Sequence, residues 1–209
     1  MKALPNILTG IRLLLSVLVF VILVAMRNAL PGVTVDGHTS NALLVLAFAA
    51  FVIAAITDFF DGWLARRYDA VSVAGAILDP IADKILVCGA ILGLAIFSPD
   101  VALPGGLILF REFSVSAMRE VLAPRGIKLP VTFLAKTKTT LQLLALGCIL
   151  GMPLLNVALI GAYDDLPRLA LVHNLMLASL GLLWLAAAVT VWTGIEYAVA
   201  ARKALKAQD

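Results

Sequence analysis

The sequence predicts an all-α protein that crosses a membrane six times and forms a single membrane domain over residues 1–209. Three observations favour this fold class. Hydrophobic residues make up 62% of the 209 positions and charged residues only 14%, whereas soluble globular domains carry roughly 25% charged residues. Six stretches approach the roughly 20 mainly apolar residues that a spanning helix needs. The basic residues, in addition, fall on alternate loops.

The six expected spans follow one another along the chain. They cover residues 7–27, 41–64, 74–97, 104–122, 134–152 and 170–198. The first resembles a secretory signal because Lys2 precedes an apolar run, but Arg12 interrupts its beginning and no convincing small-residue cleavage site follows. We therefore expect this segment to be retained as a span.

The basic residues predict the orientation of the spans, because cytoplasmic loops carry an excess of lysine and arginine. In a six-span arrangement one side holds Lys2, Arg12, Arg66, Arg67, Arg125, Lys128, Lys136, Lys138, Arg202, Lys203 and Lys206. The loops of the other side hold only Arg27 and Arg168, together with several aspartates. Both termini are therefore expected in the cytoplasm.

Several ionisable side chains lie within the expected spans or at their ends. One charge at mid-bilayer costs about 2.5–3.5 kcal/mol even on the lenient insertion scale. The residues are Asp58, Asp61, Asp79, Asp83, Lys84, Arg111, Glu112, Arg119, Glu120 and Glu196. Salt bridges between helices could account for Glu112 and Glu120, which have arginines nearby, but the four aspartates outnumber the cations near them. We expect these aspartates to face a polar cavity that has a function.

The spacing of the aspartates places each of two pairs on one helix face. At 100° per residue, Asp58 and Asp61 lie about 60° apart, and Asp79 and Asp83 lie about 40° apart on the next helix. Oxygen-only ligand sets suit hard divalent ions such as Mg²⁺ or Mn²⁺. Two such ions would balance the four negative charges, and a two-metal site can stabilise both the attacking and the leaving oxygen of a phosphoryl displacement.

Small residues and an arginine accompany these pairs. Gly62 and Ala65 project on the same side as the first pair, and Gly75 lies one turn before Asp79. Their missing side chains would leave room for a nucleotide, although close helix packing explains each small residue equally well when it is taken alone. Arg66 is placed to hold phosphate, because its planar guanidinium matches phosphate oxygens.

Eight of these residues, spread over 26 positions, resemble the complete signature of the CDP-alcohol phosphotransferase family. They are Asp58, Asp61, Gly62, Ala65, Arg66, Gly75, Asp79 and Asp83. Further segments are similar to one bacterial branch of this family, the phosphatidylglycerophosphate synthases. The similar segments are residues 5–9 with Arg12, 57–62, 78–84, 111–113, 117–120 and 136–140. The last two segments resemble the branch mainly in hydropathy. The resemblance implies a six-helix fold in the bacterial inner membrane, usually a homodimer, with its active site open to the cytoplasmic leaflet and no nucleic-acid partner.

The resemblance also implies a role for each site residue. Asp58, Asp61 and Asp79 would ligate the metal ions, with Asp79 bridging the two, and Asp83 would ligate the second ion and act as general base. The CDP moiety of a CDP-diacylglycerol donor, whose acyl chains lie among the membrane lipids, would contact Asn6, Thr9, Gly62, Ala65, Arg66, Ser72 and Gly75.

Basic residues near the cytoplasmic ends of the fourth and fifth spans indicate the acceptor. Arg111, Arg119, Lys136 and Lys138 could bind the dianion of glycerol 3-phosphate, whereas serine or choline needs no such cations. Snorkelling towards anionic headgroups explains Lys138 equally well, but it explains Arg111 less well because this residue lies about eight residues inside its span. We predict glycerol 3-phosphate as the acceptor.

Other functions stay open on these residues alone. Within the family, the alternatives are synthases of phosphatidylserine, phosphatidylinositol phosphate or cardiolipin. From another class, an ion-coupled transporter also buries carboxylates in the membrane, but the sequence contains no inverted repeat of the kind such transporters use.

Overall fold

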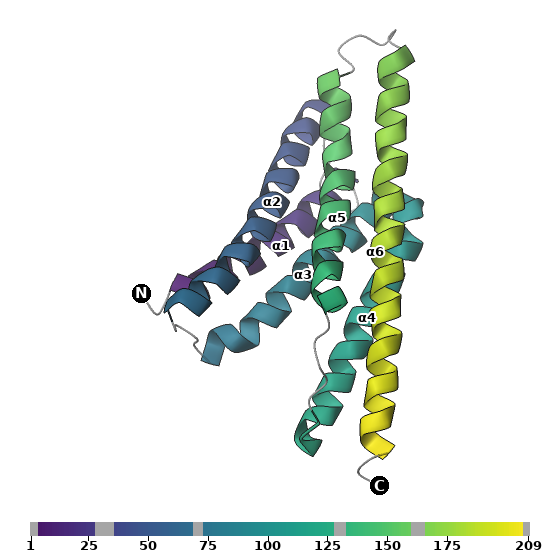
Figure 1. Ribbon diagram of the computed structural model, residues 1–209. Coiled ribbons are helices and arrows are strands. Elements are labelled where there is room, and N and C mark those ends of the chain that lie inside the picture. Colours follow the sequence, from purple (N-terminus) through teal and green to yellow (C-terminus); the bar gives the residue numbers. More distant parts are fainter. Residues whose placement is uncertain (1–3, 28–35, 69–72, 128–132, 160–165, 207–209) are drawn as a thin grey trace.

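The computed structural model describes residues 4–27, 36–68, 73–127, 133–159 and 166–206. Within these ranges, the side chains at 4–6, 37–38, 58–68, 73–80, 83, 133–136, 157, 159 and 166 are outside the description. The described chain forms α1 (Leu4–Met26), α2 (Gly37–Tyr68), α3 (Val73–Phe97), α4 (Pro99–Leu122), a 3-10 turn η1 (Ala123–Arg125), α5 (Phe133–Leu159) and α6 (Leu166–Lys206), as Figure 1 shows. The predicted all-α architecture with one helix for each span is confirmed.

The helices have the composition of a multi-pass membrane protein. Among the described residues, five helices are long and apolar enough to cross a membrane, and Lys84–Phe97 of α3 adds a shorter apolar segment. Large apolar side chains point outwards on several helices, as at Leu14 of α1, 72% exposed, and Phe110 of α4, 75% exposed. Such side chains would be unfavourable in water but are expected to contact lipid.

Some helices are longer than their predicted spans. The sixth span was predicted over 170–198, but α6 has 41 residues. At 1.5 Å per residue the helix is about 60 Å long, which is twice the roughly 30 Å thickness of the hydrocarbon core of a membrane. Hydropathy detects only the membrane-crossing part, whereas the alanines, lysines, arginine and leucine after residue 199 favour a continuing helix. The fifth span was predicted to end at 152, but α5 continues through Pro153 to Leu159, because membrane helices tolerate proline where neighbours compensate the freed backbone groups.

Local sequence signals set several helix ends. The side chain of Asp36 caps α2, accepting a hydrogen bond of 2.8 Å from the backbone N–H of Thr39. Hydrogen bonding by the side chain and then the backbone of Thr39 lowers the pKa of Asp36. Proline near the start of α4 suits a helix beginning, with Ser98 as its N-cap residue. After η1, Gly126 adopts φ 70°, a left-handed conformation that glycine enters without strain.

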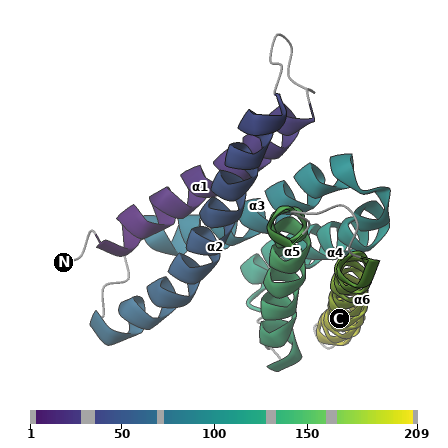
Figure 2. The same ribbon diagram turned by 90° about the horizontal axis from the view of Figure 1, so that it is seen from above.

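α3 connects the two halves of the bundle. α1 packs on α2 and α3, α4 and α5 both pack on α6, and α3 contacts α1, α2, α4 and α5. Seen from above, α6 is viewed nearly end-on, whereas α1 and α2 run obliquely across the view (Figure 2). The beginning of α1, the end of α2 and the beginning of α3 gather at one end of this half in both views.

Glycines allow close contacts between these helices. A Cβ added at Gly89 of α3 would lie 3.2 Å from the carbonyl oxygen of Ser16, and one added at Gly93 would lie 2.6 Å from the side chain of Leu23 on α1. Small residues four apart are typical of helix interfaces in membranes. The earlier glycine of α3 contacts the earlier residue of α1, and the later glycine contacts the later residue. The two helices therefore run in the same direction.

Candidate functional site

The signature aspartates lie on two consecutive helices. Asp58 and Asp61 belong to the last three turns of α2, and Asp79 and Asp83 belong to the first three turns of α3. The predicted helical setting of both pairs is thus confirmed, and α2 contacts α3. The side chains of these residues lie outside the described part, as do those of Asn6, Gly62, Ala65, Arg66 and Gly75, and Ser72 lies outside it altogether.

α1 packs on both of these helices and carries a buried polar face. Thr9 is 1%, Arg12 1% and Ser16 0% exposed, and their spacing of three and four residues places them on one side of α1. The hydroxyl of Ser16 donates to the carbonyl of Arg12 over 2.7 Å. Thr9 and Arg12 have further interactions with the protein. Thr9 was predicted at the donor site, whereas Arg12 contributed to the topology and to the family resemblance of the first span but was given no role in the site.

The α1–α3 contacts place Arg12 near the level of Asp83, the later residue of the second aspartate pair. Ser16 lies opposite Gly89. Arg12 precedes Ser16 by about 6 Å and Asp83 precedes Gly89 by about 9 Å along parallel helices. Arg12 is thus a fully buried cation on the helix that packs against both helices that carry the aspartates. Its position inside the first span was the available signal, since an intramembrane charge is a functional candidate by default, but Arg12 was not counted among these charges.

A pocket of about 380 Å³ opens between α3, α4, α5 and α6, and we call it the basic pocket. Its charged lining residues are Lys84, Arg111, Arg119, Lys138, Glu112 and Glu120. Of the predicted acceptor-binding residues, the structure brings Arg111, Arg119 and Lys138 into this pocket; the side chain of Lys136 lies outside the described part of α5. Lys84 was not assigned to the acceptor, yet it lines the pocket and directly follows Asp83.

Glu112 forms ion pairs with two of these cations. Its Oε1 accepts hydrogen bonds from Lys138 Nζ and, over 3.4 Å, from Arg111 Nη1. Lys138 and Arg111 are each only 6% exposed. The snorkelling explanation of Lys138 is therefore wrong: a carboxylate inside the bundle compensates the ammonium, which consequently has no need to reach the headgroups. Salt bridges between helices were one explanation for Glu112: its pair with Lys138 of α5 is such a bridge, whereas its pair with Arg111 lies within α4.

Two uncharged residues of α6 hold the arginines of the basic pocket. Arg111 Nη2 donates to Thr193 Oγ1 over 3.0 Å, and Arg119 Nη2 donates to Tyr197 Oη over 2.8 Å. Thr193 is 0% and Tyr197 3% exposed. Neither residue was predicted from the sequence, because neither carries a charge. Their polar groups in an apolar span, four residues apart and therefore on one helix face, were the available signal.

The charges of the basic pocket favour an anionic ligand. Four cationic and two acidic side chains give a net charge of +2. Charges in a partly desolvated pocket interact more strongly than in water, and arginine is suited to phosphate through paired hydrogen bonds. Glu196, a further charge in the sixth span, instead accepts a hydrogen bond of 3.0 Å from Trp192 Nε1 on the same helix and is not among the residues lining the pocket.

Comparison with known proteins gives consistent matches over most of the chain. Residues 2–192 match the family described as CDP-alcohol phosphatidyltransferase. Three similar bacterial proteins bear the name CDP-diacylglycerol--glycerol-3-phosphate 3-phosphatidyltransferase. The Rickettsia bellii protein is 38% identical over 183 residues, covering 86% of this chain and 92% of the relative. The Rickettsia typhi protein is 38% identical over 202 residues, covering 94% and 96%. The Cereibacter sphaeroides protein is 37% identical over 220 aligned positions, covering 93% of each chain.

Proposed function

The chain belongs to the CDP-alcohol phosphatidyltransferase family, and from this premise we propose that it transfers the phosphatidyl group of CDP-diacylglycerol to glycerol 3-phosphate. The products are phosphatidylglycerophosphate and CMP. The relatives named for this reaction cover most of the chain. The observation that carries the choice of acceptor is the basic pocket, whose net charge of +2 matches a phosphate dianion and whose Lys84 directly follows Asp83.

The donor half of the site consists of the aspartate pairs and the arginine of α2. The four carboxylates of Asp58, Asp61, Asp79 and Asp83 fit two divalent ions, Mg²⁺ or Mn²⁺, by the chemistry of the donor set. Among the described side chains, no other group of three or more histidines, cysteines or acids could hold a metal ion. When bound, such ions would neutralise the carboxylates and stabilise charge on phosphate oxygens. Arg66 would hold the pyrophosphate.

In the proposed reaction, Asp83 removes the proton from the acceptor hydroxyl. The resulting oxygen attacks the phosphorus that carries the diacylglycerol, and a new phosphodiester bond forms. The bond from this phosphorus to the CMP oxygen breaks, and CMP leaves with the electron pair. The basic pocket holds the distant phosphate of glycerol 3-phosphate, so that its free hydroxyl is directed towards Asp83.

The proposed setting is the bacterial cytoplasmic membrane, with both termini and the basic pocket on the cytoplasmic side. The distribution of lysine and arginine supports this orientation. The water-soluble acceptor would then enter from the cytoplasm, while the donor stays in the lipid with its headgroup near α2 and α3. A homodimer stays a prediction from the family resemblance.

The acceptor is tested with the purified protein in detergent, labelled CDP-diacylglycerol and a panel of acceptors. The panel contains glycerol 3-phosphate, glycerol as its uncharged counterpart, serine, inositol phosphate and phosphatidylglycerol. We expect phosphatidylglycerophosphate as the main lipid product and no reaction with glycerol. Phosphatidylserine or cardiolipin as the main product would contradict the proposed acceptor. Preference for inositol phosphate would keep the role of the basic pocket but change the substrate.

A further inference from the structure

α6 carries a buried polar stripe formed by Thr190, Thr193 and Tyr197. These residues are 0%, 0% and 3% exposed, and their spacing of three and four residues puts them on one helix face. Thr190 accepts a hydrogen bond of 2.8 Å from Gln142 of α5. Thr193 and Tyr197 instead accept from arginines of α4. One end of the stripe, Thr190, therefore contacts α5, and the other residues contact the arginines of the basic pocket.

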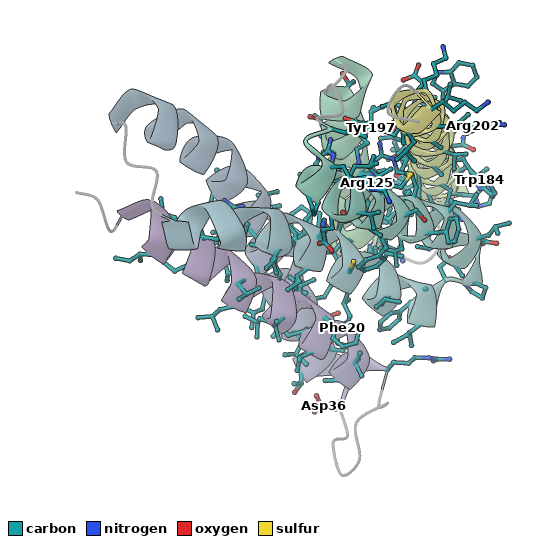
Figure 3. All side chains as sticks on the ribbon, turned by 90° about the horizontal axis from the view of Figure 1, so that it is seen from below. Phe20, Asp36, Arg125, Trp184, Tyr197 and Arg202 are labelled. Carbon is teal, nitrogen blue, oxygen red and sulfur yellow. The ribbon has the colours of Figure 1, made fainter. Side chains whose placement is uncertain are left out.

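Tyr197 contacts both arginines of the basic pocket at once. Its ring centroid lies 5.4 Å from Cζ of Arg111 and 5.0 Å from Cζ of Arg119, within the range of cation–π attraction. Its hydroxyl also accepts the hydrogen bond from Arg119. Figure 3 shows Tyr197 on the side of α6 that faces the other helices, whereas Trp184 projects from the outer side.

The two arginines need such a support. They lie eight residues apart on α4, about two turns and 12 Å along the helix, and their like charges repel. One aromatic ring with a phenolic oxygen attracts both guanidinium groups and orders side chains that otherwise have many rotamers. Ordering them before a ligand arrives lowers the entropic cost of binding it.

We propose that Tyr197 is a positioning residue that holds Arg111 and Arg119 as one preformed pair for the acceptor's phosphate. This inference rests on the proposed function, because the pair is useful only if the acceptor carries a phosphate. Tyr197 acts through the arginines, so its removal weakens acceptor binding and leaves the donor lipid and the chemical step unaffected.

Two substitutions separate the contribution of the Tyr197 hydroxyl to acceptor binding from that of its ring. Tyr197→Phe keeps the ring and its volume but removes the hydrogen bond, and we expect the KM for glycerol 3-phosphate to rise about 2- to 10-fold. Tyr197→Leu removes the ring as well, and we expect a rise of about 10- to 100-fold. The kcat and the KM for CDP-diacylglycerol should stay within about twofold of wild type in Tyr197→Phe.

Inorganic phosphate provides a readout that does not depend on turnover of the acceptor. It should inhibit the wild-type enzyme in competition with glycerol 3-phosphate, and its inhibition constant should rise in the two variants by factors similar to the KM. Thr190→Val is the matched control, because it removes a buried hydrogen bond from the same stripe without touching an arginine. We expect it to lower the melting temperature but to leave the acceptor KM within about twofold of wild type.

The outcomes distinguish this inference from the proposed function. A wild-type enzyme that uses serine and ignores glycerol 3-phosphate overturns both. A wild-type enzyme that uses glycerol 3-phosphate, together with an unchanged acceptor KM in Tyr197→Phe and Tyr197→Leu, overturns only the role of Tyr197. Equal rises in Thr190→Val and Tyr197→Phe also overturn it, because they indicate a general disturbance of α6.

Discussion

Replacing Lys138 by methionine removes one ammonium group from the basic pocket while keeping a long, flexible side chain. Two consequences follow from its contact with Glu112. The acceptor loses a cation, and a charge-assisted contact is commonly worth about 1.5–3 kcal/mol. Glu112 loses its closest partner among the described side chains and retains the 3.4 Å contact with Arg111. This draws Arg111 towards the carboxylate and away from a bound phosphate.

The magnitude follows from these two effects. A loss of about 1.4 kcal/mol lowers kcat/KM tenfold, so loss of this contact lowers kcat/KM for glycerol 3-phosphate roughly 10- to 150-fold. Removing one partner of a buried ion pair costs about 3–5 kcal/mol of stability. Because Glu112 keeps its contact with Arg111 and the pocket is open, we expect a smaller loss of folding stability in Lys138→Met, about 1–3 kcal/mol.

The assay varies each substrate separately in detergent and records the melting temperature of every variant. The double variant Lys138→Met with Glu112→Gln removes both charges, so we expect it to regain stability while its acceptor KM stays high; such a cycle isolates the coupling of the pair. Lys203→Gln, at an exposed position near the end of α6, controls for the loss of a positive charge elsewhere. An unchanged acceptor KM in Lys138→Met, or an equal rise in both substrates' KM values, would refute the reasoning.

Three further predictions concern the metal, the base and the first arginine. Activity should require Mg²⁺ or Mn²⁺, with Ca²⁺ a poor substitute because paired sites favour the smaller ions; full turnover in excess EDTA would contradict the two-metal proposal. Asp83→Asn should lower kcat by about 10²–10⁴-fold while CDP-diacylglycerol still binds, which equilibrium binding of the labelled lipid checks. Arg111→Lys should raise the acceptor KM because an ammonium cannot reproduce the paired hydrogen bonds of a guanidinium, and steady-state kinetics showing wild-type values would remove Arg111 from phosphate binding.

The sequence predicted the parts of this fold and site that depend on local patterns. Long apolar runs identified all six α-helices of the described residues, and the spacing of the aspartates placed each pair within one helix. The basic residues near the cytoplasmic ends of the fourth and fifth spans identified three members of the basic pocket, Arg111, Arg119 and Lys138. These predictions succeeded because periodicity and the cost of burying charge act along a single segment.

The sequence did not predict features that depend on how the helices pack. The contacts of Thr193 and Tyr197 require the register of α6 against α4, which no local pattern determines. Lys138 was open to two explanations because its partner Glu112 lies on another helix. Arg12 was assigned to the cytoplasmic side of the first span but not to the site, because only the α1–α3 contacts place it near the level of Asp83.

The presence of acidic residues in the basic pocket has a physical reason. Four cations gathered in a partly buried pocket would repel one another and lose much of their hydration. Glu112 compensates Lys138 and Arg111, both almost fully buried, whereas Arg119 is held by a neutral tyrosine and remains more exposed. The acids thus reduce the charge of the empty pocket from +4 to +2. A bound dianion then brings the net charge of the pocket to zero, whereas a zwitterion such as serine leaves the charge of +2 uncompensated. The carboxylates that stabilise the pocket without a ligand therefore also favour a phosphorylated acceptor.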